Sequence, residues 1–136
     1  MQNLQNDKTV FGLDQNVAAG LAYIPVCLCH FIVSIGILAT DKTHKLPRFH
    51  AIQSLLITAS MVVGYVVMFV LIAIVIAIAA VLNAPGLMFV SFIFYFALFA
   101  YILALFIGLI ISCINAFQGK VSKLPVIGNL ADKWSN

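Results

Sequence analysis

The chain has 136 residues, a mean hydropathy of +1.15 and a formal net charge of +3. Residues 49–119 contain no Asp, Glu, Lys or Arg, which excludes a water-soluble fold because soluble helices need a charged outer face. The basic residues lie at the borders of the apolar segments, so their charge indicates orientation in a membrane and argues against nucleic-acid binding.

Three apolar segments predict an all-α integral membrane protein, a single membrane domain over residues 1–136 with three transmembrane helices. Long apolar runs favour bilayer-spanning helices, because a helix satisfies its own backbone hydrogen bonds in hydrocarbon. The predicted transmembrane helices cover residues 17–39, 51–82 and 87–117. The second and third exceed what one crossing requires, so we expect them to tilt, kink or project beyond the bilayer.

The first apolar segment admits two interpretations. We predict a single crossing because membrane helices tolerate proline, but Pro25 between Gly20 and Gly36 leaves open a pair of short half-helices that re-enter the membrane. His30 is a candidate haem or metal ligand or proton relay. Because no second ligand lies at a fixed spacing, we favour a hydrogen bond from His30 to a facing helix or a place for His30 in a partner interface. His30 shares one predicted helical stripe with further polar residues, namely Tyr23, Cys27 and Ser34.

The distribution of basic residues predicts the topology. Three of them lie in the loop over residues 40–50, Lys120 and Lys123 follow the third segment, and the turn over residues 83–86 has no charge. Because basic loops stay in the cytoplasm, we expect a bacterial inner-membrane protein with its amino terminus outside and its carboxyl terminus inside. Residues 1–16 lack the basic start of a secretory signal, so we expect the first apolar segment to be retained.

The tail over residues 120–136 carries a short amphipathic pattern. Ile127, Leu130, Ala131 and Trp134 recur at helical spacing, and polar residues take the other face. This pattern predicts a short helix on the cytoplasmic membrane surface, with Trp134 at the level of the lipid headgroups. A frayed tail is the alternative for so short a segment.

Polar residues in the third segment favour helix packing over a pore. Gly108 and Ser112 belong to a series of small residues four apart, which lets helices approach closely, and Asn115 can then bond across the contact. A pore lining would show a richer polar stripe. The sequence contains no paired intramembrane carboxylates, phosphate-binding loop, dinucleotide fingerprint or zinc spacing. We therefore expect neither enzymatic activity nor a bound cofactor.

Three stretches of the chain carry a resemblance to a known family. They are residues 12–19, residues 48–56 with the sequence Arg-Phe-His-Ala-Ile-Gln-Ser, and residues 119–133 with the sequence Leu-Pro-Val-Ile-Gly. Over nearly its whole length the chain resembles the Tic-twenty-like small bacterial membrane proteins, relatives of the chloroplast inner-envelope import component. The resemblance implies a helical integral membrane protein. The plant relatives are associated with a protein-import translocon and have four membrane segments.

The motif residues also have a physical interpretation of their own. Arg48 can reach lipid phosphate and fix the depth of the second helix, and Pro125 stops the tail from continuing as helix. Because both motifs lie on the predicted cytoplasmic side, we expect them to dock onto each other or onto one partner. The predicted interface residues are Arg48, Phe49, His50, Gln53, Leu124, Pro125 and Trp134.

These observations predict a non-enzymatic membrane subunit that packs against other membrane proteins or copies of itself, in contact with membrane lipids. The resemblance implies a role in protein assembly or transport. A first alternative is an oligomeric pathway for a small solute or ion, with His30 and Asn115 facing a shared axis. A second alternative is a redox subunit that binds haem through His30.

Overall fold

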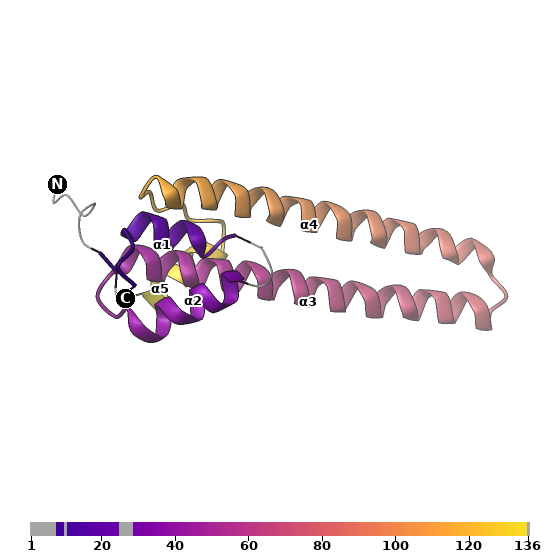
Figure 1. The fold of residues 1–136 in the computed structure, drawn as a ribbon. Helices are drawn as coiled ribbons and strands as arrows, with labels where there is room; N and C mark the ends of the chain where they lie inside the picture. Colours follow the sequence, from indigo (N-terminus) through magenta and orange to yellow (C-terminus); the bar gives the residue numbers. More distant parts are fainter. Residues whose placement is uncertain (1–7, 10, 25–28, 136) are drawn as a thin grey trace. The chain divides into compact units, whose positions relative to one another are not determined.

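The regular elements in the computed structural model are helices. The structure describes residues 8–9, 11–24 and 29–135, and in this part an isolated β-bridge pairs Lys8 with Asp14. The predicted all-α class is confirmed. The elements are α1 (Gln15–Leu21), α2 (Cys29–Thr40), α3 (Lys45–Val81), the 3₁₀ helix η3 (Pro85–Leu87), α4 (Met88–Phe117) and α5 (Ile127–Ser135) (Figure 1).

Among the described residues, α3 and α4 are the helices long and apolar enough to cross a membrane. They have 37 and 30 residues, or roughly 55 Å and 45 Å, against a hydrocarbon core of about 30 Å. The apolar segments predicted over residues 51–82 and 87–117 are therefore helical. α3 already begins at Lys45, because Pro47 falls in its first turn, where the missing N–H group would have no helical partner anyway.

Both long helices end in the same way. After α3, Asn83 adopts a positive φ of 47°, and the next N–H group, that of Ala84, donates to the carbonyl of Ala79 (3.0 Å). After α4, Gly119 has a φ of 69°, and Lys120 donates to the carbonyl of Asn115 (2.8 Å). These are Schellman caps, which satisfy carbonyls left free at a helix end and suit glycine or asparagine.

The single helix predicted over residues 17–39 is wrong, because the segment forms α1 and α2 instead. α1 ends at Leu21, and Tyr23 and Ile24 donate to carbonyls only three residues back (3.0 and 3.3 Å). Pro25, outside the described residues, has no N–H group and disfavours helix in the residue before it. At 7 and 12 residues, neither α1 nor α2 can cross a bilayer alone, so three crossings are not confirmed.

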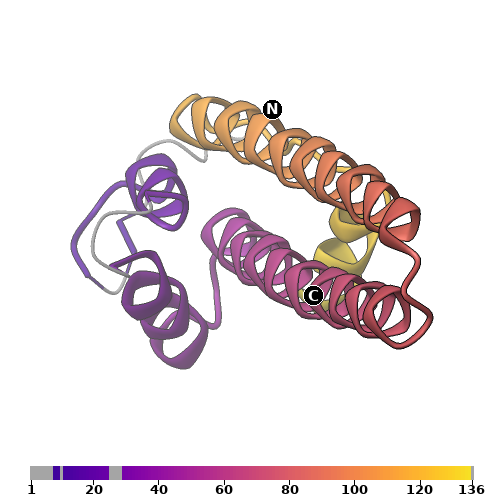
Figure 2. The same ribbon diagram turned by 90° about the vertical axis from the view of Figure 1, so that its right-hand side faces the viewer.

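The chain divides into two compact units. Unit 1 comprises residues 1–58 and 107–136, and unit 2 comprises residues 59–106. In unit 1, α1 and α2 lie side by side (Figure 2), and Ala18 and Ala22 of α1 meet Ile37 of α2 and Ala51 of α3 in a buried cluster. The small alanine side chains let the three helices approach closely.

α1 contacts the end of α4. A Cβ atom on Gly20, near the end of α1, would lie 2.5 Å from the Phe117 ring, so the ring would have to move for any larger residue. The Asn16 amide nitrogen donates to the Phe117 carbonyl (3.0 Å), one of the carbonyls that α4 leaves free at its end. Because α2 leads directly into Lys45 at the start of α3, the stretch formed by α1 and α2 begins and ends at the same, basic end of unit 1.

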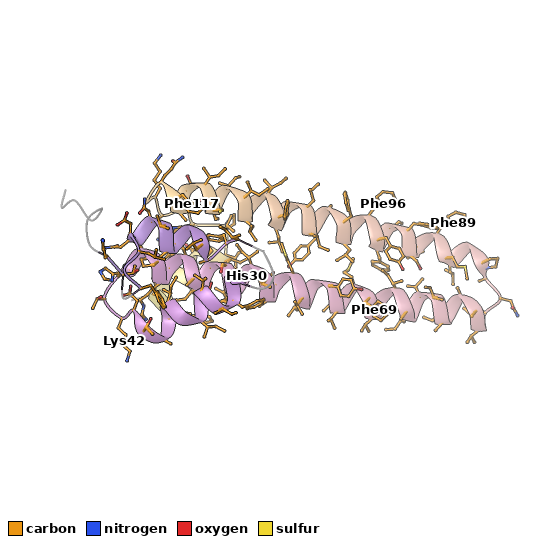
Figure 3. The ribbon with its side chains drawn as sticks, viewed as in Figure 1. His30, Lys42, Phe69, Phe89, Phe96 and Phe117 are labelled. Atoms are coloured by element: carbon orange, nitrogen blue, oxygen red, sulfur yellow. The ribbon has the colours of Figure 1, made fainter. Side chains whose placement is uncertain are left out.

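Unit 2 is a helical hairpin formed by the later part of α3 and the earlier part of α4. A Cβ atom on Gly64 would lie 2.5 Å from the Tyr101 ring, and the Tyr101 hydroxyl bonds the Ser60 hydroxyl (2.5 Å) and donates to its carbonyl (3.0 Å). A groove of about 360 Å³ lies beside this contact. Most large apolar side chains of the hairpin are exposed, among them those of Phe69, Phe89 and Phe96 (Figure 3).

The predicted C-terminal helix is present as α5, and small residues form the face that packs inward. Gly128, Ala131 and Ser135 are buried, whereas Leu130 and Trp134 are exposed. A Cβ atom on Gly128 would lie 2.6 Å from the backbone of Lys123, so the helix is packed too closely for large residues on this side. Small residues therefore face inward, although hydrophobicity alone would have turned the larger ones inward.

Candidate functional site

The buried polar side chains of unit 1 gather around His50, which is fully buried. Its Nε2 atom lies 3.1 Å from the Lys120 carbonyl, and because a carbonyl can only accept, Nε2 carries the proton and donates. The Nδ1 atom of the neutral ring then accepts from the Tyr23 hydroxyl (3.0 Å). Both ring nitrogens of His50 are thus paired within the chain, in one defined tautomer.

Gln53 lies one turn further along α3 and is also fully buried. Its amide nitrogen donates to the Ser112 hydroxyl and to the Ser122 carbonyl, both at 3.0 Å. Its Oε1 atom has no hydrogen-bond partner in the part of the chain that the structure describes. Together, His50 and Gln53 fasten α3 to α1, to α4 and to the segment after α4, and this set forms the polar cluster of unit 1.

A second set of polar contacts joins α2 to α3. The buried hydroxyls of Ser34 and Ser54 lie 3.0 Å apart. His30 Nε2 lies 3.3 Å from the Thr58 hydroxyl, which itself donates to the Ser54 carbonyl (3.0 Å). His30 therefore bonds a facing helix, and its Nδ1 atom is buried without a partner among the described residues.

Residues 8–9, 11–24 and 29–135 contain no cluster of side chains that supports metal or haem binding. No group of three His, Cys, Asp or Glu side chains there could hold a metal ion. Of the stripe predicted with His30, Tyr23 and Ser34 are buried against α3, and Cys27 lies outside the described residues. Haem binding through His30 stays a prediction.

The structure brings the two predicted interface motifs together within one chain. Phe49 packs against Ala131 of α5, in addition to the bonds from His50 and Gln53 to the segment after α4. Arg48 is half-buried, and its Nε atom has no partner among the described residues. A role in binding a partner stays a prediction, for which the exposed members are Pro125 and Trp134.

The predicted packing residues of α4 have three different environments. Gly108 is buried, and a Cβ atom there would lie 3.1 Å from the Leu124 side chain. Ser112 accepts the bond from Gln53. Asn115 contributes its carbonyl to the Schellman cap. In this structure, the small residues Gly108 and Ser112 of α4 thus contact the chain's own tail and the side chain of Gln53.

Sequence reasoning missed two kinds of partner in the polar cluster. The carbonyls of Lys120 and Ser122 leave no trace in the sequence, because every residue has one. Ser54 was assigned no role, although its place one turn before Thr58 on α3 is a signal that could have been used. The positive φ of Gly119 directs Lys120 back toward α3, and the glycine after an apolar helix is a recognisable cap signal.

Asp41 holds the loop between α2 and α3 and is fully buried. Its Oδ1 atom accepts from the N–H groups of Thr43 (3.3 Å) and His44 (3.1 Å), and the His44 ring nitrogen lies 2.8 Å away. Burial by itself would raise the pKa of Asp41, but the hydrogen bonds from His44 and Thr43 outweigh it, so the pKa lies below its ordinary value.

We expect Asp41→Asn to lose about 1 kcal/mol of stability near neutral pH, because bonds to a charged acceptor are stronger than bonds to a neutral one. The folded-state pKa is lowered, so the stabilisation is present above the unfolded-state pKa and is lost as the pH falls through the folded-state value. Thermal unfolding in detergent from pH 3 to pH 7 tests this. Asp14→Asn, at an exposed carboxylate, is the control, and equal pH profiles for the wild type and Asp41→Asn would contradict the expectation.

The helices and the composition define a class: this is an all-helical membrane protein, in which a hairpin of apolar helices is joined to a unit with a buried polar cluster. The chain is 31% identical to the UPF0132 membrane protein MJ1443 of Methanocaldococcus jannaschii, over 94% of each chain. The chain belongs to the UPF0132 membrane protein family. No family model and no solved structure matches it. The relative's name supports a membrane protein but not the Tic-twenty-like assignment, which stays a prediction.

Proposed function

We propose that the chain is a non-enzymatic integral membrane subunit that packs against other membrane proteins or against copies of itself. The observation that carries this proposal is the exposure of its apolar helices. In the most apolar stretch of each long helix, only 6% (α3) and 11% (α4) of the residues are buried within the chain. Lipid covers part of such a surface, and the groove beside Gly64 and Tyr101 offers a concave apolar surface to a neighbouring helix.

The polar cluster supports a structural role over a catalytic one. His50 uses both ring nitrogens within the chain, and the Gln53 amide nitrogen bonds two groups of the same unit. A solute pathway needs polar groups open to a shared channel, and a catalytic base needs a free lone pair toward a substrate. Neither alternative gains support from side chains whose bonds are directed inward.

The contacts of unit 1 support a topology with two crossings, in which α3 and α4 each span the membrane once. In this proposal α1 and α2 form a re-entrant pair, buried against α3 and α4, as irregular backbone within a membrane must be. Both termini then lie on the side of the basic residues, which the positive-inside rule assigns to the cytoplasm of a bacterial inner membrane. The proposal replaces the predicted outside location of the amino terminus.

The Tic-twenty-like resemblance gains a physical basis from the same contacts. Its first stretch contains Asn16, which bonds the end of α4, and its second contains His50 and Gln53, which bond the third stretch at Lys120 and Ser122. The three stretches thus converge in unit 1. This convergence favours a shared fold, and a role in protein assembly or transport follows from the resemblance as part of our proposal.

A photo-reactive residue placed at Val67 in the groove tests the partner contact in native membranes. We expect irradiation to join the full-length chain to one protein of reproducible mass, identified by mass spectrometry, or to a second, differently tagged copy. A photo-reactive residue at Val81, 82% exposed at the end of α3, is the matched control and should join mainly lipid. Equal yields of protein products at both positions, or lipid products alone, would contradict the proposal.

A further inference from the structure

The outward face of α5 carries an apolar stripe. Val126, Leu130 and Trp134 follow one another at a spacing of four residues and are 77%, 40% and 54% exposed. Leu130 and Trp134 lie above one another on α5. Val126 directly precedes the helix, where its carbonyl accepts from the Leu130 N–H group (3.2 Å), and it extends the stripe at the start of α5. The inward face of the helix is occupied by small residues, so this stripe is not needed for packing within the chain.

The backbone at Val126 adds an independent observation. Its φ is 65°, and the Ile127 N–H group donates to the Pro125 carbonyl (2.7 Å), which makes a tight γ-turn. A β-branched residue is strained in this conformation, and glycine or asparagine would adopt it with less strain. Val126 is 77% exposed, so burial within unit 1 does not account for a β-branched residue at this position.

The charges around the stripe indicate what covers it. Asp132 uses both carboxylate oxygens on lysines, with Lys123 Nζ at 2.8 Å and Lys45 Nζ at 3.6 Å. The hydrogen bond from Lys123 is the main cause that lowers the pKa of Asp132. Asp41 is buried and bonded within its own loop. The surplus charge of this end of unit 1 is therefore positive, with Lys133 exposed directly beside Trp134.

The ion pair between Lys45 and Asp132 joins α5 to the start of α3. Lys45 is the first residue of α3 and lies a few residues before its apolar segment, where the positive-inside rule expects basic residues beside the membrane surface. We propose that Val126, Leu130 and Trp134 insert into a layer of anionic lipid headgroups, with Lys133 at the phosphates. Apolar stripes flanked by lysine bind such surfaces, and tryptophan favours the interface. The inference goes beyond the proposed partner contact and does not depend on it.

Trp134 is the only tryptophan in the sequence, so its fluorescence reports on α5 without labelling. The experiment uses the purified full-length protein in nanodiscs of phosphatidylcholine, with or without phosphatidylglycerol. We expect quenching by lipids brominated near the headgroup, and protection from aqueous acrylamide that increases at least about twofold when phosphatidylglycerol is added. Lys133→Gln should remove most of this increase and retain the quenching by brominated lipid.

Two further variants separate lipid contact from other causes. Val126→Gly keeps the turn and removes a side chain of the stripe, so it should weaken the quenching by brominated lipid, whereas Ile32→Ala, at an exposed residue of α2, should not. Protection from acrylamide without quenching by brominated lipid would assign the stripe to a protein neighbour and overturn the proposal. Full access to acrylamide in both kinds of nanodisc would overturn it as well.

Discussion

Gln53→Ala is expected to lower the unfolding free energy of the protein in detergent by about 2–4 kcal/mol. The substitution removes two hydrogen bonds at 3.0 Å from a fully buried side chain, leaves the Ser122 carbonyl and the Ser112 hydroxyl without this donor, and opens a small cavity. Denaturant or thermal unfolding, followed by circular dichroism, measures the loss. Because the bonds connect α3 with the chain after α4, the tail should also become sensitive to protease before the long helices unfold.

A matched control is available at the end of α4. Gln118 is exposed, and its side chain accepts a hydrogen bond from the exposed ammonium of Lys120 (2.9 Å), so Gln118→Ala should change stability by less than about 0.5 kcal/mol. Gln53→Glu has nearly the same shape as the wild type but cannot donate to the Ser122 carbonyl, so it should be at least as unstable as Gln53→Ala. If Gln53→Ala and Gln118→Ala unfold alike, the polar cluster does not hold unit 1 together.

Single cysteines at Leu13, Lys42 and Asn129, in a variant whose own 3 cysteines are replaced by alanine, are expected to react with a membrane-impermeant maleimide from the same side of the membrane. The proposed re-entrant pair brings the chain back to the side on which it entered. A cysteine at Asn83 should react from the opposite side, because a helix from Lys45 to Val81 is long enough to cross once. Labelling of intact spheroplasts before and after permeabilisation distinguishes the two sides.

A different labelling result would contradict the topology with two crossings. If the cysteine at Leu13 reacts together with the one at Asn83, the stretch over residues 15–40 crosses the membrane fully, and the sequence-based topology with an outside amino terminus is right. All four positions are in exposed or turn segments, so a missing reaction reports on the side of the membrane and not on burial.

The long helices and the turn between them could be predicted because their causes are local. A stretch without charge has to be helical in hydrocarbon, and Asn83 followed by Pro85 marks an end to helix. The sequence left open whether the first segment is one helix or two, because hydropathy measures how apolar a stretch is and not whether it continues as one helix. Gly20 packs against Phe117, about a hundred residues away, and no local pattern contains that contact.

In the candidate site, too, some residues could be predicted from local sequence and others could not. Arg48, His50 and Gln53 could be singled out because polar residues at the edge of an apolar segment are unusual. Their partners could not, since two of them are backbone carbonyls placed by the cap at Gly119. Which face of α5 packs inward could not be predicted either, because it depends on the close approach of Gly128 to Lys123, and this contact leaves Leu130 and Trp134 exposed.

Unit 1 is built from both ends of the chain, and this has a consequence for biosynthesis. Chains are made from the amino terminus, and the polar groups of His50 and Gln53 find their last partners in Lys120, Ser112 and Ser122. The hairpin of unit 2 can form while the ribosome is still adding residues, because its contacts are close in sequence. Unit 1 has to wait for release of the finished chain, and during that interval its unpaired polar groups are exposed to whatever receives the nascent protein at the membrane.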